Sequence, residues 1–339
     1  MKNSKFLKLC VWGGVAILVG SAAIIRARAQ NRHDPFFDFG DRGEIIHVLP
    51  TPAAIHNPRD MQPTDAPVVN GTAVYPSSYG SGSLNDHGGP EISSASFRAI
   101  YWNGNVADSG ATSLGYSSIS SQIDNFISRF SGTATQNWSD SATDDYTIIQ
   151  QYGSSDPISS LLPNQGSHVD NRATQSSISD SKIQQYLAGL FANGSELADP
   201  TVLYGLYFPK GMKISLQGGV SCSSFCGYHS HFTYNGQLIK YAAFPYTDCR
   251  ACSVTGKTVA DILTIVTSHE IREAVSDSLG SAWYDAAGYE ADDKCAWHNL
   301  YQMTNGGFWV QPEYSNGGTR TASGFTATYP GPGCVVPNR

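Results

Sequence analysis

Charged side chains are scarce in this chain of 339 residues: Asp, Glu, Lys and Arg together make up 14% of it, against about 25% in ordinary soluble domains. Basic residues are fewer than acidic ones, 21 against 28, which gives a net charge of −7. A nucleic-acid-binding protein normally presents a basic stripe, so this balance argues against that class. The 40% share of hydrophobic residues argues against a mainly disordered chain, because it suffices for a sizeable core.

Three common catalytic motifs are missing after residue 29. The chain contains no G-x-S-x-G, no G-x-G-x-x-G and no G-x-x-x-x-G-K-[ST]. The sequence therefore lacks the nucleophile turn of α/β-hydrolases, the dinucleotide fingerprint and the phosphate-binding loop. Any catalytic chemistry must come from other residue types.

Long apolar runs are limited to one, from Val11 to Ile25, and its roughly 15 residues fall short of the roughly 20 that a spanning helix needs. Lysines precede this run, and Ala27-Arg28-Ala29 supplies an A-x-A cleavage site. Residues 1–29 are therefore predicted to be a secretory signal peptide, with an uncleaved anchor as the alternative. Five of the 21 basic residues lie in this segment, so 16 basic and 28 acidic residues would remain, a charge of −12. We expect a secreted, periplasmic or extracellular protein with no stable membrane span after cleavage.

Six cysteines follow the predicted signal peptide, an even number that is typical of a disulfide framework in an exported chain. The pairs predicted here are Cys222–Cys226, Cys249–Cys252 and Cys295–Cys334. The alternative is a zinc site, since Cys249 and Cys252 form a C-x-x-C, although the other close pair has C-x-x-x-C spacing.

The chain divides by composition at about residue 90. Residues 30–90 hold 8 of the 17 prolines and show no sustained periodicity, which predicts a linker or pro-segment with little core of its own. Residues 91–339 are predicted to form a single α+β domain with a mixed or antiparallel sheet. Its expected elements are strands at 96–103, 144–152 and 201–208, helices at 119–130, 182–191 and 258–279, and a β-hairpin at 228–246 whose turn is Asn235-Gly236.

The predicted helix at 258–279 carries ionisable residues on its apolar face. Thr258 and Asp261 fit an N-cap and its capping-box partner, and Gly280 fits the C-terminal stop. On a helical wheel the acidic residues of the second half continue the apolar arc of the first half, and His269 lies at its edge. The residues concerned are Val259, Ile262, Leu263, Val266, Glu270, Glu273 and Asp277. Burying such groups unpaired costs several kcal/mol each, so they need a cation, a polar network or a cleft.

His269-Glu270-Ile271-Arg272-Glu273 resembles the H-E-x-x-H motif of zinc metallopeptidases, with Glu273 in the second ligand position. The i, i+4 spacing allows His269 and Glu273 to hold one ion, and Glu270 is the candidate general base for water. Glu290 and Asp293, which follow the helix, are candidate further metal ligands. The alternatives are a buried polar network on the helix and a solvated acidic loop after it.

His229 and His231 precede the predicted hairpin turn. Because side chains alternate along a strand, both imidazoles should face the same side of the sheet, where they could contact metal or substrate. A polar strand face without a function is the alternative.

Three blocks of the sequence together resemble a group of exported bacterial and fungal proteins. That group carries S-H-E-x-x-E-A-[IV]-[ST]-D, a W-Y pair and E-x-x-D-x-C-A-W, which match residues 268–277, 282–285 and 290–297. The chain is also similar, more distantly, to the plant phosphate-induced/EXORDIUM family, and the similarity spans about residues 89–334. The resemblance implies an extracellular or wall-associated protein with a zincin-like helix. It implies no established reaction, because the plant members are associated with growth signalling.

Two functions remain open from the sequence. The first is an exported metal-dependent hydrolase, metallopeptidase-like, that acts on an extracellular peptide or cell-wall polymer. Zinc is the expected ion, although Mn or Ca would also suit a carboxylate-rich set. In this hypothesis the hairpin's edge strand lies along the substrate cleft. The second is a non-catalytic, EXORDIUM-like interaction protein, in which the same carboxylates form a structural polar network or a calcium site.

Overall fold

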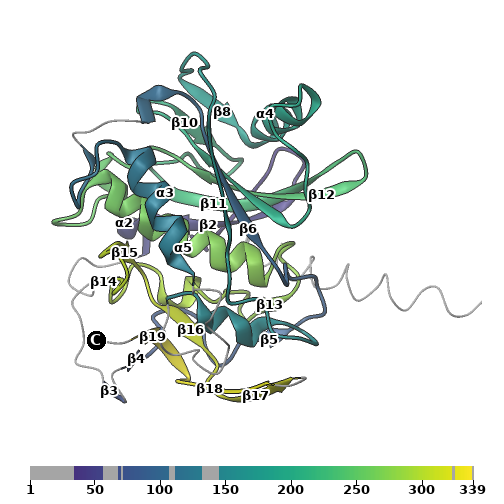
Figure 1. Cartoon of the computed structure of the whole chain (residues 1–339), viewed down its shortest axis with the longest axis vertical. Coiled ribbons are helices and arrows are strands. Elements are labelled where there is room, and N and C mark those ends of the chain that lie inside the picture. The colour runs from purple at the N-terminus through teal and green to yellow at the C-terminus, as the bar shows by residue number, and fades with distance from the viewer. Residues whose placement is uncertain are drawn as a thin grey trace, which may run out of the picture.

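A seven-stranded mixed sheet runs through the middle of the protein (Figure 1). The computed structural model describes residues 34–55, 68–69, 72–106, 111–131, 145–322 and 325–337, so the predicted signal peptide lies outside the described residues. From one edge to the other the sheet contains β1 (Phe37–Phe39), β2 (Ile45–Pro50), β11 (Phe225–Tyr234), β12 (Gln237–Phe244), β9 (Val202–Tyr207), β6 (Ser96–Tyr101) and β7 (Asn164–Val169). The first four strands pair antiparallel and the last four parallel. The predicted α+β class with a mixed sheet is confirmed.

Helices cover both faces of this sheet. They are α2 (Pro52–Ile55), α3 (Ile119–Phe130), α4 (Asp180–Ala192) and α5 (Val259–Ser276). One hydrophobic core joins α3 and α5 to one face of the sheet, and a second joins α4 to the other face. Side-chain alternation decides which strand residues join which core. On β2, for example, Ile46 and Val48 face α4, whereas Leu49 faces α5.

Most of the predicted elements are confirmed. The predicted helices correspond to α3, α4 and α5, and the strands at 96–103 and 201–208 correspond to β6 and β9. Asn235 and Gly236 form the hairpin turn with φ of 47° and 80°, as a two-residue turn between twisted strands requires. Thr258 caps α5 and forms the predicted capping box with Asp261.

The prediction of a strand at 144–152 is wrong. This stretch contains a 3₁₀-helix, η4 (Thr147–Tyr152), and all six of its residues are buried. A short apolar run without alternation does not distinguish a buried strand from a buried helical turn.

The prediction that residues 30–90 are a linker with little core is also wrong for the described part of this stretch. β2 lies inside the main sheet, where it pairs with β11, and its residues from Ile46 to Pro50 are buried. Phe36, Tyr75 and Leu84 belong to the core on the α5 side. β2 lies next to β11 and pairs with it from Phe225 to His229, so this part of β11 is not an edge strand, which corrects that expectation as well.

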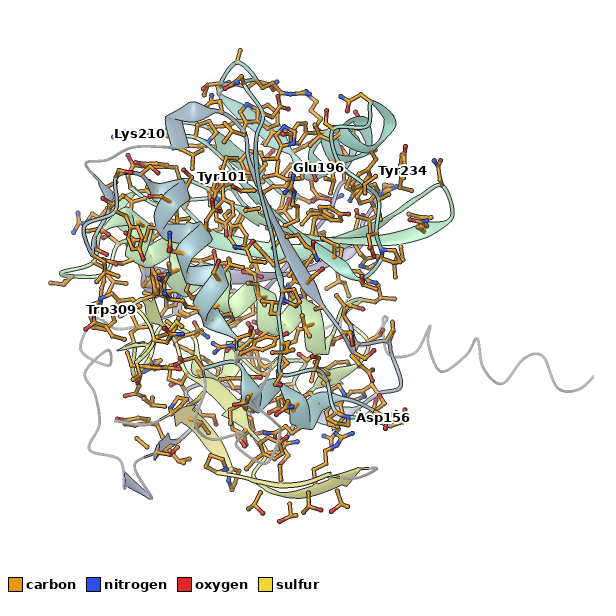
Figure 2. The ribbon with its side chains drawn as sticks, in the orientation of Figure 1. Tyr101, Asp156, Glu196, Lys210, Tyr234 and Trp309 are labelled. Atoms are coloured by element: carbon orange, nitrogen blue, oxygen red, sulfur yellow. A yellow bond between two sulfur atoms is a disulfide. The ribbon has the colours of Figure 1, made fainter. Side chains whose placement is uncertain are left out.

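The C-terminal part packs beneath α5 as smaller sheets (Figure 1). A four-stranded sheet has the order β16-β19-β4-β3, and three two-stranded pairs are β17 with β18, β14 with β15 and β13 with β5. A fourth pair, β10 with β8, lies at the other end of the molecule near α4 (Figure 1). The bounds are β3 (Val68–Val69), β4 (Thr72–Tyr75), β5 (Asn85–Asp86), β8 (Ser177–Ser179), β10 (Lys213–Ser215), β13 (Trp283–Tyr284), β14 (Tyr301–Gln302), β15 (Trp309–Val310), β16 (Glu313–Ser315), β17 (Gly318–Ala322), β18 (Phe325–Tyr329) and β19 (Gly333–Val336). Short 3₁₀-helices are η1 (Gly104–Val106), η5 (Arg250–Cys252) and η6 (Asp293–Cys295). Figure 2 shows Trp309 and the hairpin residue Tyr234 at opposite sides of the molecule.

Three disulfides are present, and only Cys295–Cys334 is paired as predicted. The two local pairs are wrong, because the bonds are Cys222–Cys249 and Cys226–Cys252. They join the start of β11 to η5, which precedes α5, so each bond crosses between two segments that lie side by side. Since Cys249 and Cys252 are both oxidised, the C-x-x-C is not available as a thiolate zinc site.

Within the described residues, none of the helices has both the length and the apolar character needed to cross a membrane.

Candidate metal centre

Helix α5 is buried on every side, so its charged residues do not form a solvated face. Every residue from Ala260 to Ser276 is buried, including His269, Glu270 and Glu273, each at most 1% exposed. The main sheet covers one side of the helix and the C-terminal strands cover the other. This burial excludes a chance H-E-x-x-E string on a solvated helix.

The first group of ligand atoms joins α5 to η6. His269 Nε2 lies 3.0 Å from Glu273 Oε2, one turn further along the helix, and 3.7 Å from Asp293 Oδ1. The backbone N–H of Asp293 donates to Glu273 Oε1 at 2.8 Å, which fixes η6 against the helix. One atom from each of these three side chains lies within 4.8 Å of the other two. The structure thus brings together these three residues, which the sequence singled out as candidate metal ligands.

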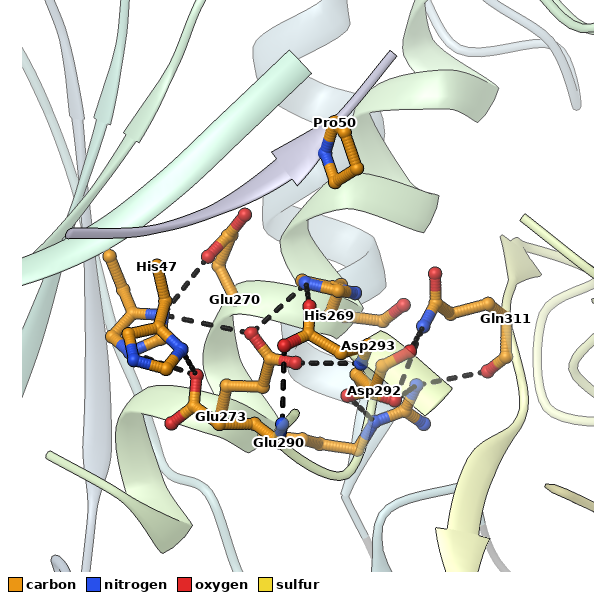
Figure 3. Close-up of polar contacts among 12 residues, drawn as sticks. His47, Pro50, His269, Glu270, Glu273, Glu290, Asp292, Asp293 and Gln311 are labelled. Atoms are coloured by element: carbon orange, nitrogen blue, oxygen red, sulfur yellow. Dashed lines mark hydrogen bonds and ion pairs between the residues drawn. The ribbon is translucent and has the colours of Figure 1, made fainter. Parts of the chain in front are cut away.

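The second group places β11 over the same helix face. His229 Nδ1 lies 3.1 Å from Glu270 Oε2 and 3.8 Å from Glu273 Oε2. Figure 3 shows Glu270 and Glu273 between His47 and His269. Gly227 allows this close approach, because a Cβ at that position would lie 2.4 Å from Val266 Cγ1 and 3.2 Å from Glu270 Oε1. His229 thereby orients the predicted general base.

The third group was not expected, because it includes a residue of the predicted linker. His47 on β2 is the register partner of His229 on β11. Its Nδ1 lies 2.7 Å from Glu290 Oε2, which is also 3.7 Å from His229 Nε2. His47, Glu290 and Asp293 form a further set of ligand atoms within 4.8 Å of one another. The β-branched run at Ile45-Ile46 is the signal that could have identified this strand.

His231 lies outside these three groups. It follows His229 by two residues on β11 and is paired with Lys240 of β12. Burial lowers the pKa of His231. Besides His229, the charged groups that act on this pKa are Glu44, Lys240 and Arg42, and none of them is a carboxylate of the cluster. A substrate-contacting role for His231 stays a prediction.

A buried ion pair beside the cluster holds the loop after α5 in place. Arg272 donates from Nε and Nη2 to the two oxygens of Asp292, each at 2.8 Å. Nη2 also donates to the Gln311 carbonyl, and Gln311 Nε2 donates to the Asp292 carbonyl. The sequence assigned no role to Arg272, Asp292 or Gln311. A bidentate pair of this kind fixes the direction of the backbone that carries Glu290 and Asp293.

Burial shifts the ionisation of the cluster strongly. Burial raises the pKa of Glu270 to about 8. Burial and, to a smaller extent, the neighbouring carboxylates raise the pKa values of Glu273, Glu290 and Asp293 well above their usual range. Burial lowers the pKa of His47 to about 3 and that of His229 to about 4. Neutral imidazoles and oxygen ligands that lack a compensating charge are the donor set that binds a divalent cation.

No protein-family model, curated protein or solved structure matches this chain. Its function is therefore inferred from the residues of the site. The buried His and Glu groups on α5, together with Asp293, could form a metal site. An imidazole with carboxylates suits zinc, and a set this rich in oxygen also suits Mn or Ca.

Proposed function

We propose that this chain is an exported metal-dependent hydrolase of the metallopeptidase type, with zinc as its ion. The observation that carries the proposal is the convergence of His269, Glu273 and Asp293 next to Glu270, whose carboxylate contacts His229. The primary ion would be held by the first three residues. The resemblance of residues 268–277 to zincin helices supports the same assignment.

A bound divalent ion would acidify water and polarise a substrate carbonyl. Glu270 would accept a proton from the attacking water and later donate it to the leaving amine, as general base and then general acid. Its Oε2 contacts His229 Nδ1 at 3.1 Å, and its carboxyl group also has a backbone hydrogen bond with Leu49. The substrate would be an extracellular peptide or cell-wall polymer.

The test measures metal content and hydrolysis on the same preparation of the mature chain. We expect bound zinc and the cleavage of unstructured peptides. Glu270→Gln should retain the zinc and lose hydrolysis by about 10²-fold or more, because it removes the base but no ligand. His168→Ala is the control, since His168 lies on the edge strand β7, contacts Glu196 and is outside the cluster. A zinc-loaded wild type that cleaves no peptide would contradict the proposal.

A second candidate is a non-catalytic extracellular protein in which the ion is structural. It is favoured by burial, because His47 is 5% exposed, His229 is 4% exposed, and Glu270, Glu273, Glu290 and Asp293 are at most 1% exposed. A surface hollow of about 300 Å³ lies at Arg98, Glu196 and Tyr204 and includes none of the cluster residues. In this case the ion would hold the loop Glu290–Cys295 against α5. Bound calcium or zinc in an inert protein whose stability depends on the ion would support this candidate.

A further inference from the structure

The ligand residues expected for a single ion divide into two overlapping sets. His269 and Glu273 share Asp293 with a separate pair, His47 and Glu290. The two oxygens of Asp293 face different partners: Oδ1 lies 3.7 Å from His269 Nε2, and Oδ2 accepts the backbone N–H of Glu290 at 3.1 Å. A carboxylate placed between two ligand sets can bridge two ions.

The charge of the cluster also exceeds what one divalent ion would neutralise. Its four carboxyl groups, those of Glu270, Glu273, Glu290 and Asp293, are at most 1% exposed. In the described part of the chain, the ion pairs of lysine and arginine all go to other carboxylates, those of Glu44, Asp170, Glu196, Asp248, Asp285, Asp292 and Glu313. When all four are ionised, one divalent cation leaves two of the four charges uncompensated, and two cations leave none. Buried charges without a partner are strongly disfavoured.

Unpaired ligand atoms mark the second position independently of the charge. His47 Nδ1 and Glu290 Oε2 are 2.7 Å apart, and neither atom has a hydrogen-bond partner among the described residues. Glu290 Oε1 likewise has no N–H donor among the described residues, and the Glu290 carboxyl group lies beside that of Asp277. Polar atoms this deeply buried are normally satisfied. An imidazole nitrogen and a carboxylate that converge without bonding to each other are suited to bind a cation between them.

We propose that the cluster is a two-ion centre, in which His269, Glu273 and Asp293 hold one divalent cation and His47, Glu290 and Asp293 hold the second. The second position rests on the metal-binding part of the proposed function but not on hydrolysis. It joins β2, near the N-terminal end of the described chain, to the loop after α5. His229 Nε2, 3.7 Å from Glu290 Oε2, is placed to be a further ligand of the second ion.

The test is a count of ions per chain. The full mature protein is stripped with a chelator, titrated with Zn²⁺ in the presence of a weak competing chelator, and analysed by native mass spectrometry and elemental analysis. We expect two Zn²⁺ per folded chain. His47→Ala should retain one, and His231→Ala, as the control on the neighbouring strand, should retain two. Circular dichroism and the melting temperature show whether each variant is folded.

The outcomes separate this inference from the proposed function. One Zn²⁺ in the wild type would overturn the two-ion centre and leave the hydrolase proposal standing, whatever happens to the variant. No bound Zn²⁺ would overturn both. Two Zn²⁺ in folded His47→Ala would overturn the assignment of the second position to His47. If His47→Ala does not fold, two ions in the wild type together with one in Glu290→Gln would support the proposal, and two in Glu290→Gln would overturn it.

Discussion

His47 Nδ1 lies 2.7 Å from Glu290 Oε2. This contact joins β2 to the loop that follows α5. This relationship makes the N-terminal strand part of the candidate metal centre. It also means that the sheet, the helix and the loop must all be in place before the ligand atoms converge. The first prediction follows from it.

Removal of residues 30–55 should destabilise the protein by several kcal/mol. Ile46, Val48 and Leu49 are at most 3% exposed, and burial of an aliphatic side chain of this size contributes about 1.5–3 kcal/mol. The shortened chain should therefore melt at a much lower temperature than the full mature chain in a thermal scan. An equal melting temperature would show that β2 is dispensable.

Chelation of the metal should lower the melting temperature of the wild type. A ligand that binds only the folded state at 100 times its Kd stabilises it by about 2.7 kcal/mol. His269→Ala and Glu273→Ala should lose the ion that these residues hold, so chelation should lower their melting temperatures less than that of the wild type. If the cluster is only a polar network, these variants and Glu270→Gln would instead each lose about 1–3 kcal/mol. Their metal content would then be unchanged, and this result would refute the metal centre.

Gly227→Ala should destabilise the protein by about 1–3 kcal/mol, because the new methyl group would overlap Val266 and push α5 away from β11. Gly189→Ala in α4 is the matched control. A Cβ at position 189 meets no atom within 4 Å, so this substitution should stabilise the helix by about 0.5–1 kcal/mol. Urea denaturation of both variants measures the contrast. Similar stabilities in the two variants would show that Gly227 is not needed for the close approach.

The stability of the wild type relative to Asp180→Asn should fall as the pH rises from about 4 towards neutrality. Asp180 accepts hydrogen bonds from Tyr228 and Tyr241 at 2.7 and 2.5 Å, yet burial raises its pKa above the ordinary 3.8. Between the unfolded and the folded pKa the folded state binds more protons, so the free energy of unfolding decreases with rising pH by at most about 1.4 kcal/mol per unit. Urea denaturation across this range measures the difference. A difference that grows with pH would contradict the sign.

Non-reducing peptide mapping should recover crossed disulfides. Trypsin cleaves after Lys213, Lys240, Arg250 and Lys257, so it leaves Cys222 and Cys226 on one peptide but separates Cys249 from Cys252. The bonds Cys222–Cys249 and Cys226–Cys252 should join all three peptides into one species. Further cleavage after Phe225 should release two distinct linked pairs with these partners. An unlinked peptide containing both Cys222 and Cys226 would restore the local pairing.

The central helix was largely predictable because its signals are local. Thr258 and Asp261 form a capping box that requires only neighbouring residues, and the i, i+4 spacing of His269 and Glu273 places both on one face wherever the helix lies. The hairpin turn at Asn235-Gly236 is local for the same reason. Such features depend on backbone geometry within a few residues, which the sequence states directly.

The N-terminal strand was not predictable in this way. The run at Ile45–Pro50 is short and lies among prolines, so its composition favoured a linker. It forms a strand because β11 offers it an antiparallel partner and α5 and α4 cover its two faces. The stabilisation of such a strand comes from burial against distant residues, which no local pattern reports.

The sequence by itself determined the α5 helix and its His269 and Glu273 pair, since both depend on spacing along the chain, and the presence of six cysteines after residue 29. The tertiary structure decided that His47 and His229 join the cluster, that Arg272 pairs with Asp292, and that the disulfides cross between segments. The physical reason is that ligand sets, buried ion pairs and disulfides depend on distances between atoms. Those distances are fixed only when the sheet packs on the helix.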